Sequence, residues 1–119
     1  MPDPSILRAL ESVITERKTN PPAKRSYVVT LLEGGVPAIG AKVVEEAAEV
    51  VEAADESGEE GRAHLIRETA DLLYHTLVLL GRRDVPLAEV EAELARRFGI
   101  GGIEEKESRG VRTPGSRPG

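Results

Sequence analysis

The sequence predicts an all-α fold of about five helices built around a long antiparallel helical hairpin. Leu, Val, Ala and Ile recur at the spacing of one helix face in most segments. No segment shows the sustained apolar and polar alternation of a half-buried strand. The aromatic residues, which strands favour, are only Tyr27, Tyr74 and Phe98.

The first two expected helices are short. Asp3-Pro4 is a suitable cap and first turn for a helix that Asn20-Pro21-Pro22 ends. Its apolar stripe consists of Ile6, Leu7, Leu10, Val13 and Ile14. Ser26 is expected to cap a second helix, from Tyr27 to Glu33, that stops at Gly34-Gly35.

Proline and glycine residues delimit the next three expected helices. Pro37 suits the first turn of a third helix that runs to about Glu56. After a break at Ser57-Gly58, a fourth helix runs from about Glu60 to Arg82. Pro86 opens a fifth helix, which ends near Arg97.

Length and composition exclude several classes of protein. The 119 residues suit a single domain, expected over residues 1–109, with a disordered tail over 110–119. A net charge of −5 argues against nucleic-acid binding, and the absence of Cys excludes disulfide scaffolds, thiolate zinc sites and cysteine nucleophiles. We find no signal peptide, no apolar run long enough for a bilayer, no P-loop and no nucleophile elbow. We therefore expect a soluble, cytoplasmic protein.

Four acidic residues form the main candidate site. Glu46 and Glu49 are three apart on the third expected helix, as are Glu68 and Asp71 on the fourth. In an antiparallel hairpin, residues equally far from the turn are level with each other. Glu46 should thus lie level with Asp71, and Glu49 with Glu68. The same rule pairs Lys42 with His75.

The apolar pattern indicates how the two helices are turned. The third helix is expected to bury a stripe that Glu46 borders, made of Ile39, Val43, Ala47, Val50 and Ala54. The fourth helix is apolar almost all round, which is typical of a buried helix. Its polar strip should then lie inside the structure; this strip is His64, Glu68, Asp71 and His75.

Converging carboxylates repel one another unless some are protonated or a cation neutralises them. Oxygen-only ligands favour Mg²⁺ or Mn²⁺, and Mg²⁺ on carboxylates gathers phosphate oxygens. Glu45 is an additional candidate ligand, and Lys42 is either a phosphate contact or a salt-bridge partner of Glu46. Solvated acidic faces are the alternative. His64 and His75 could complete a transition-metal site, although a buried His paired with a carboxylate is more common.

The chain resembles the phosphoribosyl-ATP pyrophosphohydrolase family, which belongs to the all-α, MazG-like nucleoside triphosphate pyrophosphohydrolases. The shared ExxE and ExxD pattern is Glu46-x-x-Glu49 followed by Glu68-x-x-Asp71. The narrower resemblance rests on further stretches in order. These are Ser26-Tyr27, Leu31-Leu32, Gly35, Lys42-Val-Val-Glu45, Ala70 to His75, Val90 to Leu94, Arg96-Arg97 and Glu105 to Arg109.

The resemblance implies hydrolysis of phosphoribosyl-ATP to phosphoribosyl-AMP and pyrophosphate, the second step of histidine biosynthesis. The implied metal ligands are Glu46, Glu49, Glu68 and Asp71, with Glu45 or Glu49 accepting the proton of the attacking water. The implied substrate contacts are Lys42, Lys106 and Arg109, then Arg25 and Arg97, and more weakly Ser26 and Tyr27.

The resemblance also implies partners. We expect a homodimer or a dimer of dimers, in which dimerisation completes the MazG-like bundle and buries the surplus apolar surface of the fourth helix. The cyclohydrolase of the next step has a zinc site with cysteine ligands. Because this chain contains no Cys, the cyclohydrolase should be a separate protein. The alternatives are a house-cleaning pyrophosphatase of free nucleoside triphosphates and a non-catalytic helical interaction module. Lys106, Arg109 and Ser26-Tyr27 favour the histidine pathway over the former.

Overall fold

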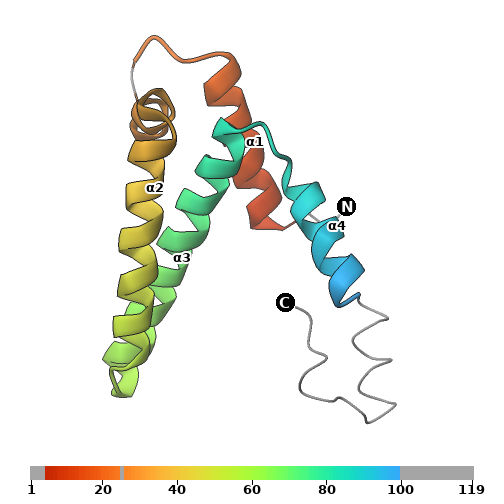
Figure 1. Cartoon of the computed structure of the whole chain (residues 1–119). Coiled ribbons are helices and arrows are strands. Elements are labelled where there is room, and N and C mark those ends of the chain that lie inside the picture. Colours follow the sequence, from red (N-terminus) through yellow and green to blue (C-terminus); the bar gives the residue numbers. More distant parts are fainter. Residues whose placement is uncertain (1–4, 25, 100–119) are drawn as a thin grey trace. The chain divides into compact units, whose positions relative to one another are not determined.

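The computed structural model describes residues 5–24 and 26–99, and these ranges are helical apart from short connections (Figure 1). The helices are α1 (Ile6–Thr19), α2 (Tyr27–Ala54), α3 (Gly58–Arg82) and α4 (Leu87–Arg97). No strand occurs in the described ranges, so the all-α prediction is confirmed. The chain divides into two compact units, Met1–Val85 with α1 to α3 and Pro86–Gly119 with α4. Asp3-Pro4 and the expected tail, 110–119, lie outside the described residues.

Four helices replace the expected five because the second and third are joined into α2. The expected break is nevertheless present as a kink at Gly35, with φ 74° and ψ −168°. Glycine enters this left-handed region without the clash that a Cβ atom causes. Pro37 follows two residues later, where its fixed φ suits the first turn of the resumed helix.

The helix caps mostly follow the sequence. The Ser26 side chain accepts a hydrogen bond from the Val29 amide at 3.4 Å, which confirms it as the N-cap of α2. Asn20 ends α1 as expected. The N-cap of α1 is Ser5, whose side chain accepts from the Arg8 amide at 3.3 Å.

Helices α2 and α3 pair antiparallel as a long hairpin, as predicted, and lie side by side in Figure 1. Only residues 55–57 connect them. Helix α1 packs against both, chiefly against α3. The centre of the core contains one almost completely buried residue from each of α1, α2 and α3. These residues are Ile14, Ile39 and Val78. The hairpin is therefore the scaffold on which the acidic residues are placed.

The buried stripe of α2 differs from the expected one. Ala47 and Ala54 are exposed, whereas Glu46 and Ala53 are buried. The observed stripe alternates steps of four and three along the helix, which keeps each residue facing a nearly parallel neighbour. It consists of Ile39, Val43, Glu46, Val50 and Ala53. A carboxylate thus replaces an alanine in the line that faces α3.

Within the described residues of the single chain, α3 is buried on only part of its surface, and the exposed apolar remainder is the surface that dimerisation is expected to cover. Leu77 and Val78 are buried, but Ile66 is 55% exposed and Leu73 is 45% exposed. Asp71, expected inside, is exposed as well. The single chain covers α3 with α2 along one side, and contacts from α1 such as Ile14 against Gly81 lie at its C-terminal end.

By length and composition alone, α2 is apolar enough to cross a membrane. The core helix of a soluble protein passes the same test. Its buried side, which includes Ile39 and Glu46, lies within the packed hairpin, as in a core helix.

Lys18 joins α1 to the C-terminal end of α3. Its Nζ donates to the carbonyl oxygens of Gly81 at 2.9 Å and Arg82 at 3.3 Å, and it pairs with Asp84 Oδ1 at 2.6 Å. A cation is favoured at this helix end, where backbone carbonyls lack partners. We expect Lys18→Met to lower the free energy of unfolding by about 1 kcal/mol, measured by urea denaturation. The exposed Lys24→Met is the control, and equal losses in both variants would contradict this role.

Candidate metal centre

Acidic side chains from both arms of the hairpin meet in two overlapping groups. The ligand atoms of Glu46, Glu68 and Asp71 all lie within 4.8 Å of one another. The same is true of the ligand atoms of Glu49, His64 and Glu68. The structure therefore brings Glu46 close to Asp71 and Glu49 close to Glu68, as the distances from the turn predict. Glu68 belongs to both groups.

The four carboxylates differ in burial. Glu46 is only 7% exposed, and its Oε1 is buried without a hydrogen-bond partner. The Glu68 side chain is 14% exposed, and Glu49 is half-buried. Asp71 is exposed and marks the solvent side of the cluster. The cluster thus extends from a buried oxygen of Glu46 to the solvent-exposed Asp71.

Burial and mutual repulsion disfavour the ionised form of these acids. Burial, and then the neighbouring acids Glu68 and Asp71, together raise the pKa of Glu46 to about 7. The pKa of Glu49 is also raised, chiefly by repulsion from Glu68. At Glu46 and Glu49, burial and repulsion therefore outweigh the effect of nearby positive charge.

The residues present fit a divalent cation. An unpartnered buried carboxylate oxygen costs free energy unless a proton or a cation meets it. The first group supplies oxygen ligands only, which suits hard ions. The arrangement can therefore neutralise its own repulsion by binding such an ion.

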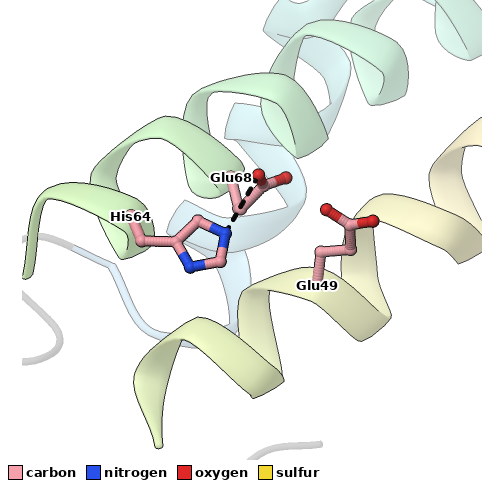
Figure 2. A group of neighbouring side chains, drawn as sticks. All are labelled: Glu49, His64 and Glu68. Atoms are coloured by element: carbon pink, nitrogen blue, oxygen red, sulfur yellow. Dashed lines mark ion pairs between the residues drawn. The ribbon is translucent and has the colours of Figure 1, made fainter. Parts of the chain in front are cut away.

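His64 has a second acidic neighbour that the sequence did not indicate. Its Nδ1 is 3.0 Å from Glu56 Oε1 and 3.2 Å from Glu56 Oε2. Its Nε2 is 3.3 Å from Glu68 Oε2, the pair marked in Figure 2. The hydrogen bond to Glu56 raises the pKa of His64. Glu56 lies in the connection between α2 and α3, where helical spacing does not predict the direction of a side chain.

His75 is buried, but its partners differ from those expected. Its Nδ1 is 2.9 Å from the Asp71 carbonyl oxygen, which can only accept, so Nδ1 donates. Its Nε2, 2.7 Å from the Tyr27 hydroxyl, is then the acceptor of that hydroxyl hydrogen. Among the described residues, His75 is therefore satisfied by a carbonyl and a phenol, and it is not part of either acidic group. No pattern in the sequence indicates the contact with Tyr27, 48 positions away.

Of the two alternatives for Lys42, the salt bridge with Glu46 is absent from the described structure. Lys42 Nζ pairs with Glu45 Oε1 at 3.3 Å because Glu46 is turned inward against α3. This hydrogen bond to Glu45 raises the pKa of Lys42, with smaller contributions from Tyr27 and Glu46. Lys42 is thus a cation beside the buried acid.

Two of the remaining candidates have local partners. Ser26 caps α2. In α4, Arg97 Nε pairs with Glu93 Oε2 at 2.9 Å. Arg25, Lys106 and Arg109 lie outside the described residues.

Comparison with known proteins agrees with the acidic pattern. Residues 7–98 match the family described as PRA-PH, phosphoribosyl-ATP pyrophosphohydrolase. A phosphoribosyl-ATP pyrophosphatase of Rhodopirellula baltica is 47% identical over 108 residues, 89% of this chain and 90% of that protein. Proteins of the same name from Geotalea daltonii and Geobacter metallireducens are 51% and 50% identical. They match 87% of this chain and 94% and 92% of their own lengths. The chain therefore belongs to the phosphoribosyl-ATP pyrophosphohydrolase family.

Proposed function

We propose that this chain hydrolyses the α–β phosphoanhydride of phosphoribosyl-ATP to phosphoribosyl-AMP and pyrophosphate, the second step of histidine biosynthesis. Membership of the family supports this substrate. The observation that carries the chemistry is the buried, unpartnered Glu46 oxygen among converging carboxylates. Such a cluster suits a cation that also binds the phosphates of a substrate.

We propose Mg²⁺, with Mn²⁺ as a substitute, as the ion. Its ligands would be Glu46, Glu49, Glu68 and Asp71, which two helices hold in two overlapping groups that share Glu68. When bound, such an ion neutralises phosphate charge and lowers the pKa of a water molecule. The exposed side of the cluster, at Asp71, leaves the substrate a way in from solvent.

The chain's own residues supply proton transfer and phosphate binding in this proposal. Glu49 or Glu45 accepts the proton of the attacking water. Glu45 is exposed and paired with Lys42, and Glu49 is half-buried beside Glu68. The proposed phosphate contacts are Lys42, Lys106 and Arg109, then Arg25 and Arg97, with Ser26 and Tyr27 as weaker candidates.

Substrate comparison tests this function. Pyrophosphate release is measured from phosphoribosyl-ATP with Mg²⁺, beside ATP, dUTP and dCTP, each with an EDTA control. We expect release from phosphoribosyl-ATP alone, abolished by EDTA. Release from the free triphosphates alone would assign the chain to the house-cleaning branch. A folded chain that releases no pyrophosphate from any substrate would leave the helical interaction module.

We further propose that the chain is a homodimer or a dimer of dimers in solution, acting before a separate phosphoribosyl-AMP cyclohydrolase in the cytoplasm. Large apolar side chains remain exposed on the outer sides of the hairpin. They are Val44 and Val51, each 70% exposed, with Ile66 and Leu73. Isolated exposed apolar residues are ordinary, but stripes on neighbouring helices indicate an interface.

Sedimentation equilibrium tests the oligomeric state. We expect the wild type at micromolar concentration to have at least twice the 12.8 kDa mass of the chain. Val44→Ser with Val51→Ser should weaken the association because it removes apolar surface from the interface. The exposed Ser12→Ala is the control. A wild-type monomer would contradict the proposal.

A further inference from the structure

His64 lies at the edge of the carboxylate cluster with one ring nitrogen turned toward it. Its Nε2 is 3.3 Å from Glu68 Oε2, and the ligand atoms of Glu49, His64 and Glu68 all lie within 4.8 Å of one another. In Figure 2, His64 and Glu68 come from α3 while Glu49 reaches toward them from α2. One nitrogen and two carboxylates from two helices therefore face a common point.

The other ring nitrogen of His64, Nδ1, is hydrogen-bonded to Glu56. Nδ1 is 3.0 Å and 3.2 Å from the two oxygens of Glu56, which accept, so Nδ1 carries the hydrogen and donates it. In the neutral ring, the lone pair is then on Nε2, the atom that faces Glu68. A carboxylate on the far nitrogen orients metal-bound histidines in the same way.

A second observation concerns the adjoining oxygen-only group, which contains a buried acid without a compensating partner among the described residues. Glu46, 7% exposed, has a buried Oε1 without a hydrogen-bond partner, and it shares the neighbour Glu68 with His64. The positive side chain closest in sequence to Glu46, Lys42, is paired with Glu45 instead. The group that shares Glu68 with His64 therefore retains an uncompensated oxygen.

We propose that Glu49, His64 and Glu68 form a second metal position, which prefers a divalent transition-metal ion such as Zn²⁺ to Mg²⁺. Imidazole nitrogen is a good ligand for Zn²⁺ and a poor one for Mg²⁺. The oxygen-only position of Glu46, Glu68 and Asp71 has the opposite preference. This inference rests on the metal-dependent function proposed above, because the second position takes Glu49 and Glu68 from the four ligands proposed for Mg²⁺. An ion at either position therefore alters the binding of an ion at the other.

Ring ¹⁵N resonances of histidine test the proposal without an activity assay. The chain contains only two histidines, so a ¹⁵N-histidine sample shows two rings, assigned with the variant His64→Leu. At pH 8 we expect Zn²⁺ to shift the Nε2 resonance of His64. The His75 resonances should stay in place, since its two nitrogens are already hydrogen-bonded. Mg²⁺ should leave Nε2 of His64 without a coordination shift.

Calorimetric titration of matched variants provides a second test. His64→Leu should weaken Zn²⁺ binding by about tenfold or more while leaving Mg²⁺ binding unchanged. Glu56→Gln should weaken Zn²⁺ binding by about tenfold through loss of the orienting carboxylate. Glu59→Gln, in the first turn of α3 and exposed, makes the same charge change and should have no such effect.

The outcomes separate this inference from the proposed function. If the chain hydrolyses phosphoribosyl-ATP with Mg²⁺ but Zn²⁺ does not shift His64, the second metal position is overturned and the function stands. If Zn²⁺ shifts His64 but no substrate is hydrolysed, the function is overturned and the position stands as a binding site. A Zn²⁺ affinity that is equal in wild type and His64→Leu would also overturn the position.

Discussion

Replacing Glu68 with Gln is expected to lower the rate of pyrophosphate release from phosphoribosyl-ATP by about a thousandfold or more. Glu68 belongs to both groups and raises the pKa of Glu46 and Glu49 on the opposite arm of the hairpin. Gln keeps the size of the side chain but removes the negative charge that a divalent cation requires. Losses of this size are typical when a group that stabilises developing charge is removed. Steady-state kinetics with saturating Mg²⁺ measures the effect.

The control for this variant is Glu52→Gln, an equal charge change at an exposed position of α2. We expect it to retain nearly full activity. Circular dichroism should show that both variants keep their helical content. If Glu68→Gln kept more than about a tenth of the wild-type rate, its carboxylate would not serve the reaction.

Replacing Glu46 with Gln should stabilise the metal-free chain at pH 8. The pKa of Glu46 is about 7 in the folded chain, against an ordinary value of 4.5. The folded chain therefore holds a proton that the unfolded chain releases, and the free energy of unfolding falls as the pH rises from about 4.5 to 7. Gln does not titrate, so the variant avoids this loss of stability. The expected gain at pH 8 is about 1–2 kcal/mol, with little gain at pH 4.5.

Urea denaturation in EDTA at the two pH values measures this effect, with Glu52→Gln as the control. Saturating Mg²⁺ should reverse the order of stability at pH 8, because only the wild type keeps the full set of ligands. A Glu46→Gln chain that is less stable than the wild type in EDTA at pH 8 would show that the buried carboxylate is favourable without an ion.

The helical hairpin and its acidic pairs could be predicted because both follow from helix period and distance from the turn. Glu46 approaches Asp71 and Glu49 approaches Glu68 in the structure. The break in α2 was likewise visible, since Gly34-Gly35 and Pro37 each have a fixed local preference. These features depend on residues near each other in the sequence or on a single short turn.

The rotation of each helix about its own axis was less predictable. Ala47 was expected to face α3, but the neighbouring Glu46 does so. An alanine buries so little area that it barely biases the choice. The pairing of Lys42 with Glu45 follows from that rotation. The contact between Tyr27 and His75 depends on how the start of α2 meets α3, which no local pattern encodes.

Anomalous diffraction from crystals grown with Mn²⁺ tests most directly whether the hairpin acids form a metal centre. We predict an anomalous peak between α2 and α3, from an ion bound by carboxylate oxygens of Glu46, Glu49, Glu68 and Asp71. The peak should disappear in Glu68→Gln crystals grown in the same way. A chain that hydrolyses phosphoribosyl-ATP with Mn²⁺, but whose crystals show no peak among these four side chains, would contradict it.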